Sequence, residues 1–377
     1  MKKRLLFFTN SLYGGGAEKV LQTLLSNLDL NKYDITLYSV NEGVLNDSYP
    51  KGINYKYIFK QNSTSFLSRL WAKIYNKFKL IIYYKFSPRT FYRLFVKGKY
   101  DTEIAFIEGY STRIISGSTN RYSKKLAWVH IDLKNNHWTT IAYKSAVEEA
   151  QCYAKFNTIV NVSESVKKNS IHLFGNNNLV TIYNPIDVNN IIELSNFASS
   201  KIPKLGNIKL ITIGRLVPQK GYDRLLPIVK QLIDEGHDIS LTILGEGSER
   251  TALEKYVVDN NLQNKVFLPG FVKNPYSIMA KHDIFVCSSR AEGYSLVIAE
   301  AMIIGLPIVS TYCSGPNELL NNGEYGILTH NSDTDLKLGL KSIISKSDIY
   351  KHFKNKAIER GAHFSLKKQI SEIEKIL

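Results

Sequence analysis

The sequence predicts an α/β protein of two Rossmann-like domains, each built on a parallel sheet covered by helices. The chain has 377 residues, more than one hydrophobic core usually holds. Short β-branched or aliphatic runs alternate with helical stretches from one end to the other, as in sheets joined by crossover helices. The same alternation begins again after a mostly polar stretch at residues 196–207.

The first half is predicted to contain strands at residues 5–9, 35–39, 104–107, 125–129 and 158–160. Helices are expected over residues 17–28 and from Ser163 onward, where serine can cap the first turn. A last strand begins at residue 180 and is broken by Asn184 and Pro185. In the second half, strands are expected at residues 208–213, 239–244, 266–268, 284–287, 308–310 and 326–328.

This pattern divides the chain into an N-terminal domain at residues 1–195 and a C-terminal domain at residues 196–360, whose sheets are expected to face each other across a cleft. Ligands of open α/β sheets bind outside the carboxyl ends of the strands, so candidate residues are sought there.

Cysteine content and hydropathy exclude several classes of protein. The cysteines are Cys152, Cys287 and Cys313, and none forms a CxxC pair, so neither a disulfide framework nor a thiolate metal site is expected. The apolar run at the N-terminus is short for a signal peptide, and no run of about 18 apolar residues suggests a spanning helix. We expect a cytoplasmic protein, soluble or peripheral to a membrane.

The net charge of +16 is concentrated in one stretch, because no acidic residue lies between Asp47 and Asp101. Within residues 60–99, apolar side chains recur every three or four positions, and lysines and arginines lie along another face. A basic, aromatic-rich amphipathic helix suits an anionic membrane surface. The alternative is an ordinary helix with an apolar face in the domain core and solvated lysines.

The strongest motif runs from Arg290 to Pro307 and contains Glu292 and Glu300. A strand ends before it and a helix is expected from about Ser295, so the amides of Gly293, Tyr294, Ser295 and Leu296 would form an anion site for a diphosphate. The spacing of eight places the two glutamates on roughly the same side, about 12 Å of helical rise apart. With that spacing, one carboxylate could face a sugar and the other a ribose. Alternatively, Glu292 caps the helix and Glu300 is solvated.

Further candidates lie beside other predicted strands. Arg215 and Lys220 follow residues 208–213, where fixed cations would stabilise the charge of a departing nucleoside diphosphate. His130 ends a first-half strand, with Asp132 a weaker candidate, and a structural histidine is the alternative. Gly245, Glu246 and Val272 would flank a nucleoside, although Gly245 and Glu246 could equally form an ordinary strand-to-helix turn. Asp333 and Asp335 are expected to cap a helix rather than bind metal.

The glycines after the first strand, which include Gly15 and Gly16, permit close approach of a ligand to the backbone. They do not form the GxGxxG dinucleotide fingerprint. A plain tight turn is the alternative interpretation.

Together these motifs resemble those of glycosyltransferase family 4, whose members are retaining enzymes of GT-B architecture with an E-x7-E motif. The resemblance extends over most of the chain and rests on the order and spacing of short matches: Ser11–Lys19, Tyr183–Asp187, Gly214–Gly221, Leu244–Ser248, the Glu292 segment and Ser314–Glu318. It implies two similar domains, an acceptor-binding one at residues 1–195 and a nucleotide-sugar-binding one at 196–360, with a helix at 361–377 returning to the first.

The resemblance also implies the chemistry. Arg215 and Lys220 would hold the donor diphosphate with the amides after Gly293 and the loop of Gly15 and Gly16. Glu292 would bind the sugar, and His130 would contact a sugar hydroxyl. We expect a UDP- or GDP-sugar donor, a saccharide or lipid-linked saccharide acceptor in capsule, lipopolysaccharide or related polysaccharide biosynthesis, no required metal and no other cofactor.

Two other functions remain open from the sequence. A nucleotide-sugar epimerase or hydrolase could use the same cleft without an acceptor. A basic nucleic-acid-binding protein could use residues 60–99, although no base-stacking module has a recognisable signature here.

Overall fold

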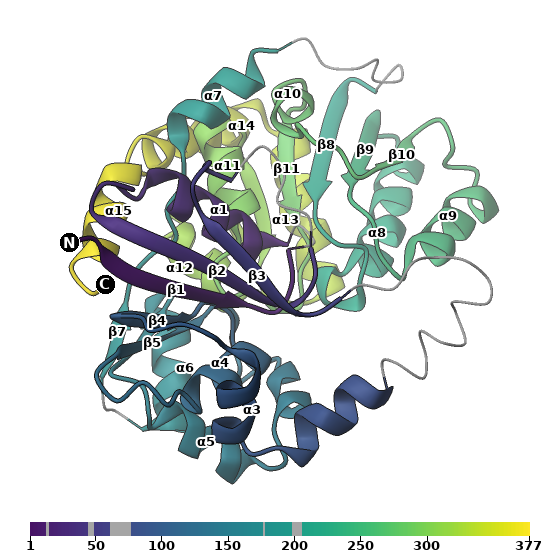
Figure 1. Ribbon diagram of the computed structural model, residues 1–377. Coiled ribbons are helices and arrows are strands. Elements are labelled where there is room, and N and C mark those ends of the chain that lie inside the picture. Colours follow the sequence, from purple (N-terminus) through teal and green to yellow (C-terminus); the bar gives the residue numbers. More distant parts are fainter. Residues whose placement is uncertain (13–14, 44–48, 61–76, 176–177, 198–205) are drawn as a thin grey trace. The chain divides into compact units, whose positions relative to one another are not determined.

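The computed structural model describes residues 1–12, 15–43, 49–60, 77–175, 178–197 and 206–377. The chain forms two compact units, unit 1 (Met1–Pro185 with Lys367–Leu377) and unit 2 (Ile186–Leu366). Each unit is a parallel sheet accompanied by helices (Figure 1). The predicted α/β fold class with two Rossmann-like halves is confirmed.

The sheet of unit 1 has the strand order β3-β2-β1-β4-β5-β6-β7. Its strands are β1 (Lys3–Thr9), β2 (Tyr33–Asn41), β3 (Asn54–Phe59), β4 (Thr102–Ala105), β5 (Lys124–Val129), β6 (Thr158–Asn161) and β7 (Leu179–Thr181). The central strand β1 is buried from Leu5 onward, as its uninterrupted apolar run predicts. The sequence prediction missed β3, an edge strand whose residues are mostly exposed or half-buried.

The helices of unit 1 include α1 (Gly16–Asn27), a helical stretch at residues 77–85, α3 (Pro88–Phe95), α4 (Tyr110–Ser116), the 3-10 turn η1 (Trp138–Ala142), α5 (Ala146–Tyr153), α6 (Glu164–Phe174) and α15 (Leu366–Glu374). Ser163 caps α6 as predicted, because its hydroxyl accepts the Val166 amide. The last residues join the core of unit 1 through Ile370, Ile373 and Leu377.

The sheet of unit 2 has the order β10-β9-β8-β11-β12-β13. Its strands are β8 (Ile208–Ile213), β9 (Ile239–Leu244), β10 (Val266–Gly270), β11 (Ile284–Cys287), β12 (Ile308–Thr311) and β13 (Ile327–Thr329), all predicted to within two residues. Helices and turns connect them: α7 (Val188–Ser195), η2 (Pro218–Lys220), α8 (Tyr222–Asp234), α9 (Arg250–Asp259), α10 (Tyr276–Met279), α11 (Leu296–Ile304), α12 (Ser314–Leu319), α13 (Asp333–Ser345) and α14 (Ser347–Gly361).

The capping residue of α13 differs from the prediction. Ser332 is the N-cap, and its hydroxyl accepts the amide of Asp335 at 3.1 Å. The Asp335 carboxylate in turn accepts the Ser332 hydroxyl at 2.6 Å, while Asp333 occupies the first helical turn. The two aspartates therefore belong to the helix start, but neither is the cap itself.

The division between the units falls between Pro185 and Ile186, earlier than residue 195. The reason is that α7 is part of unit 2, where the Asn274 side chain donates to the Leu194 carbonyl. Most of the predicted linker at residues 196–207 lies outside the described residues. Within the described ranges, no helix is long and apolar enough to cross a membrane.

Candidate functional site

The candidate residues of unit 2 lie at the carboxyl edge of its sheet. Because the strands are parallel, the segments that follow β8, β9 and β11 meet at this edge. Arg215 and Lys220 follow β8, Gly245 and Glu246 follow β9, and Glu292 follows β11.

A buried ion pair lies at the centre of this edge. The Lys220 Nζ is 2.6 Å from the Glu292 Oε1, and their side chains are only 18% and 9% exposed. The Ser289 hydroxyl donates to the same carboxylate oxygen at 2.6 Å. Burial alone would lower the pKa of Lys220, but the Glu292 carboxylate and the neighbouring Tyr222 and Cys287 together raise that pKa, so the lysine stays charged. Glu292 does not cap the helix, since the N-cap of α11 is Ser295.

The loops that carry Lys220 and Glu292 are joined by hydrogen bonds that sequence reasoning missed. The Ser288 hydroxyl donates to the Lys220 carbonyl, the Arg290 amide to the Gln219 carbonyl and the Gln219 side chain to the Ala291 carbonyl. Gly221, at φ +67°, lies so close that a Cβ there would be 2.2 Å from the Ser288 carbonyl oxygen. The close approach of the two loops requires a glycine at this position.

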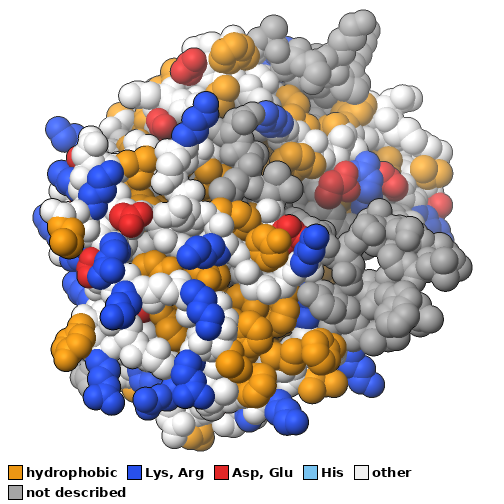
Figure 2. Space-filling view, in the orientation of Figure 1, with side chains coloured by type: hydrophobic (Ala, Val, Ile, Leu, Met, Phe, Trp, Pro, Cys, Tyr) orange, Lys and Arg blue, Asp and Glu red, His pale blue; other side chains and the backbone are white. Residues whose placement is uncertain are grey.

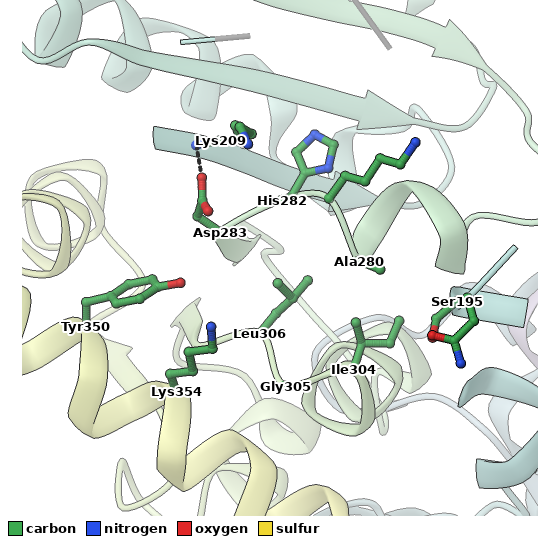
Figure 3. Close-up of a pocket in the computed structure, with 12 residues that line it drawn as sticks. Ser195, Lys209, Ala280, His282, Asp283, Ile304, Gly305, Leu306, Tyr350 and Lys354 are labelled. Carbon is green, nitrogen blue, oxygen red and sulfur yellow. Dashed lines mark hydrogen bonds between the residues drawn. The ribbon is translucent and has the colours of Figure 1, made fainter. Parts of the chain in front are cut away.

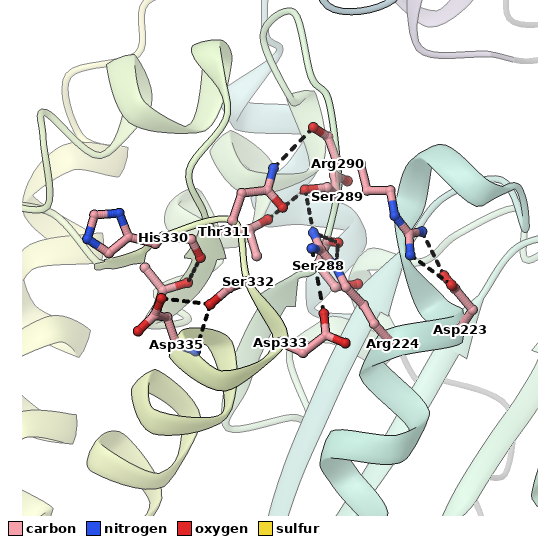
Figure 4. A network of polar contacts seen from close by, with 12 residues as sticks. Asp223, Arg224, Ser288, Ser289, Arg290, Thr311, His330, Ser332, Asp333 and Asp335 are labelled. Carbon is pink, nitrogen blue, oxygen red and sulfur yellow. Dashed lines mark hydrogen bonds and ion pairs between the residues drawn. The ribbon is translucent and has the colours of Figure 1, made fainter.

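Further polar contacts from α8 and β12 hold the backbone of the Ser288–Glu292 loop (Figure 4). Arg224 is 6% exposed and donates to the carbonyls of both Ser288 and Ser289. The Thr311 hydroxyl also donates to the Ser289 carbonyl, at 2.7 Å. Arg290 pairs with Asp223 on α8. Apart from Arg290, these residues are scattered along the sequence outside the motifs, so no local signal could have identified Arg224, Thr311 or Asp223.

The helix that follows begins later than a simple count from Glu292 assumes. Ser295 has left-handed backbone angles (φ +65°), and α11 starts at Leu296. The predicted 12 Å of helical rise between Glu292 and Glu300 is therefore wrong, because residues 292–295 are not helical. Gly293 and Tyr294 are buried in the turn before the helix.

The Ser295 hydroxyl marks a polar position at the start of α11. Its Oγ is buried and has no hydrogen-bond partner among the described residues, although a buried hydroxyl normally has one. Together with the amides at the start of α11, this hydroxyl offers donors to an anion.

Glu300 lies in the second turn of α11 and is only 3% exposed. The alternative of a solvated glutamate is therefore wrong.

The other candidates in unit 2 follow strands of the same sheet at its carboxyl edge. Arg215 is exposed. Glu246 is 53% exposed and pairs with Arg250 at 2.6 Å. Position 245 requires glycine, since a Cβ there would be 2.0 Å from the Gly214 carbonyl oxygen. Val272 is half-buried and follows β10.

His130 follows β5 at the carboxyl edge of the sheet of unit 1. Its Nε2 lies 2.8 Å from the Phe106 carbonyl and must donate to it, while its amide donates to the Glu108 carboxylate. Desolvation lowers the pKa of His130 to about 4. The imidazole is therefore neutral at pH 7, and its Nδ1 can accept a hydrogen bond from a hydroxyl group.

Gly15 and Gly16 also lie at this edge, where α1 begins after β1. Gly15 is the N-cap residue and has an extended backbone, whereas residues 13–14 of the glycine run lie outside the described ranges. Asp132 is 1% exposed and accepts bonds from the Asn135 and Asn169 side chains, so its carboxylate holds its own loop together and attaches it to α6.

The described residues contain no cluster of three or more histidine, cysteine, aspartate or glutamate side chains that could hold a metal ion. Cys152, Cys287 and Cys313 are free thiols in buried positions.

Comparison with known proteins gives a family match for unit 2. Residues 195–360 match the family model described as glycosyl transferases group 1. Over 96% of its length, the chain is 27% identical to the Campylobacter jejuni protein named N-acetylgalactosamine-N,N'-diacetylbacillosaminyl-diphospho-undecaprenol 4-alpha-N-acetylgalactosaminyltransferase, and it covers 96% of that protein. It is also 23% identical to the amylovoran biosynthesis glycosyltransferase AmsD of Erwinia amylovora, with 97% of this chain and 96% of that protein aligned.

A solved structure shares the architecture. The Anabaena protein HepE, crystallised in complex with UDP, aligns with a TM-score of 0.73 over 100% of this chain and 99% of its own, at 19% sequence identity. This likeness establishes the fold.

Proposed function

We propose that this glycosyltransferase, whose residues 195–360 match a group 1 domain, moves a sugar from a UDP-sugar to a hydroxyl of a lipid-linked saccharide. The transfer would retain the configuration at the anomeric carbon. The observation that carries the proposal is the buried Lys220–Glu292 pair at the carboxyl edge of the sheet of unit 2. Burying two charges removes them from water at a cost in free energy, and such pairs are common at ligand-binding sites.

The donor diphosphate would bind at the start of α11. Lys220 stays protonated, Arg215 is exposed at the same edge, and the Ser295 hydroxyl lacks a protein partner among the described residues. Cations and helix-terminal amides together stabilise the negative charge that grows on a departing nucleoside diphosphate. The complex of HepE with UDP supports UDP as the nucleotide.

In the transfer step, the bond between the anomeric carbon and the diphosphate oxygen breaks, and the acceptor oxygen bonds to that carbon on the same face. The acceptor hydroxyl proton passes to the leaving diphosphate. Glu292, fixed by Lys220 and Ser289, would bind the sugar and stabilise positive charge at the anomeric carbon. Glu300 would serve the ribose, with Gly245, Glu246 and Val272 near the base. His130 would accept a sugar hydroxyl at Nδ1.

A lipid-linked acceptor is supported by the Campylobacter jejuni relative, whose name specifies a diphospho-undecaprenol saccharide. The enzyme would then act in polysaccharide or glycan assembly on the cytoplasmic face of a membrane.

Purified protein tests this function in two steps. UDP-sugars and GDP-sugars are first compared by thermal shift, because a bound ligand raises the unfolding temperature. The stabilising donor is then incubated with and without a polyprenyl-diphosphate saccharide. We expect sugar transfer only with acceptor; rapid turnover of the donor alone would instead indicate a hydrolase or epimerase, and no nucleotide binding would contradict the proposal.

Contact with an anionic membrane surface is supported by the helical residues 77–85. Phe78 and Ile81 are 54% and 52% exposed, so the apolar stripe is not domain core at these positions. Arg113 holds this helix through its bond to the Tyr83 carbonyl. Basic and apolar side chains lie beside one another on unit 1 (Figure 2). Residues 61–76 of the predicted basic region lie outside the described ranges.

Vesicle binding tests this surface. Phe78→Ser with Ile81→Ser should weaken binding to phosphatidylglycerol vesicles about thirtyfold or more, since the two exposed apolar side chains together contribute roughly 2 kcal/mol or more on burial. Ile358→Ser, an exposed apolar residue of unit 2, is the matched control. Equal binding by both variants, or preference for oligonucleotides over vesicles across a salt series, would contradict membrane contact.

A further inference from the structure

Unit 2 contains a cavity of about 740 Å³ (Figure 3). It lies at the edge of the sheet opposite to the one that carries Lys220 and Glu292. Lys209 lies near the start of β8, Asp283 directly precedes β11 and Leu306 precedes β12, so the cavity lies at the amino ends of these strands. A strand of six residues separates the two edges by about 20 Å. The cavity is therefore a different place from the candidate donor site.

The walls come from five parts of the chain. They are the end of α7 with Ser195 and Asn196, the start of β8, the Ala280–Asp283 and Ile304–Leu306 segments, and α14 with Tyr350 and Lys354. The side chains of Tyr350 and Lys354 reach from α14 toward the space in front of Leu306 (Figure 3). The volume falls in the range of ordinary small-molecule pockets.

The charges of the lining are unbalanced. Lys209, Lys281 and Lys354 line the cavity against one carboxylate, Asp283. One Asp283 oxygen already accepts the Lys209 backbone amide at 2.8 Å. Among the described residues, no carboxylate forms an ion pair with the ammonium groups of Lys209 or Lys354. The cavity therefore favours an anion.

Neutral donors accompany the lysines. Burial and the Asp283 carboxylate raise the pKa of Tyr350, so its hydroxyl stays protonated and can donate. Asn196 adds an exposed amide. His282, by contrast, already bonds to the Ile278 carbonyl and the Thr242 hydroxyl, so it supports the wall.

We propose that this cavity binds a phosphorylated ligand through Lys209, Lys281 and Lys354, with Tyr350 donating to the same group. Several lysines that line one space suit a phosphate dianion, which accepts many hydrogen bonds from point charges. The space exceeds one phosphate, so the ligand carries a polar body. The phosphoryl group belongs to a small soluble molecule or to a phospholipid headgroup.

Hydrogen exchange of the full chain tests this site separately from the donor site. With inorganic pyrophosphate as the probe, amides of residues 280–284 and 304–306 should exchange more slowly, whatever happens at residues 288–297. The double variant Lys209→Gln/Lys354→Gln should need at least about tenfold more pyrophosphate for the same protection. Lys351→Gln, an exposed lysine of α14 outside the lining, should behave as the wild type.

Two further arms complete the test. Tyr350→Phe removes only a hydroxyl and should weaken protection about threefold, which guards against a folding defect in the double variant. Vesicles of phosphatidylglycerol with phosphatidylcholine, compared with phosphatidylcholine alone, test the lipid source. Protection by these vesicles alone assigns the phosphoryl group to a lipid. No protection by either probe, or protection that the double variant retains, would overturn the proposal.

Discussion

At the scale of single residues, the Lys220–Glu292 pair shows how burial strengthens the interaction between two opposite charges at the candidate site. The two residues are 72 positions apart and meet at 2.6 Å in a mostly buried place. Removing one partner leaves the other charge buried and unpaired, which costs several kcal/mol in proteins. The pair therefore serves both the local structure and the proposed donor binding.

Substitution of either partner tests its role in transfer. Lys220→Ala or Glu292→Ala should leave less than about 1% of the transfer rate, because each removes a contact to the charged transition state. Lys230→Ala is the control, since it breaks a surface pair with Asp234 and should change the rate less than twofold. Near-normal turnover by a folded Lys220 or Glu292 variant would refute the assignment, and circular dichroism would verify the fold.

His130 gives a prediction about pH. Its pKa of about 4 in the folded protein lies below the ordinary 6.5, so the unfolded chain binds more protons between these values. Stability contributed by the neutral imidazole is present above pH 6.5 and lost as the pH falls toward 4. His130→Asn should reduce this slope by up to about 1.4 kcal/mol per pH unit.

Urea unfolding at several pH values between 4 and 7 measures that slope. His172→Asn, on the exposed surface of α6, is the control for loss of an imidazole. The neighbouring Glu108 acts in the opposite sense, because burial raises its pKa, but it retains its bond to the backbone amide of residue 130. An unchanged slope in His130→Asn would show that this histidine titrates normally.

At the scale of elements, the site depends on two loops that fit against each other. The loop with Lys220 follows β8 and the loop with Glu292 follows β11, which are neighbours in the sheet. Arg224 from α8 and Thr311 from β12 hold the second loop through its carbonyls. The loop with Lys220 contains only the short 3-10 turn η2, and residues 288–295 are not helical, so each loop depends on contacts with the other.

Gly221 allows this contact to be tested. Gly221→Ala introduces both left-handed strain and a Cβ 2.2 Å from the Ser288 carbonyl oxygen. Gly236→Ala, with φ +91° and no atom within 4 Å of its Cβ, introduces the strain alone. Gly236→Ala should cost about 1–2 kcal/mol of stability and leave transfer intact. Gly221→Ala should cost more and reduce transfer at least tenfold.

Chemical denaturation and a transfer assay compare the two variants. Equal effects on stability and activity would mean that the loops move apart at no cost, which would contradict a fixed arrangement of Lys220 and Glu292.

At the scale of the whole molecule, each unit has its own buried sheet, while charge is distributed unequally along the chain. The stretch between Asp47 and Asp101 has no acidic residue. In unit 2, by contrast, Lys220 and Arg215 lie at the carboxyl edge of the sheet, and the lysines of the cavity lie at the opposite edge.

The requirement of the complete enzyme for a metal ion depends on whether its own cations neutralise the donor diphosphate. If Lys220, Arg215 and the amides of α11 neutralise the diphosphate, no divalent ion is needed. Dialysis against EDTA should therefore change the transfer rate less than twofold, and added Mg²⁺ should not raise it. A loss of more than tenfold that Mg²⁺ or Mn²⁺ restores would show that metal carries part of this charge.

The sequence by itself determined the parallel α/β fold and most of the strands. Residues 208–213, 239–244 and 284–287 were predicted with their observed bounds, because short apolar runs between turn residues indicate buried parallel strands directly. It also determined which segments reach the carboxyl edge, since strand direction alone decides that. The edge strand β3 escaped because its mostly exposed residues lack an apolar run.

Only the tertiary structure decided how the candidate residues meet. The left-handed Ser295 delays α11, so a helical count could not relate Glu292 to Glu300. Ser289, Arg224 and Thr311 support the site from distant positions, and the lysines of the cavity come from β8, the segment before β11 and α14. Periodicity reports local burial, whereas contacts between distant loops arise only when the chain folds and their side chains share one space.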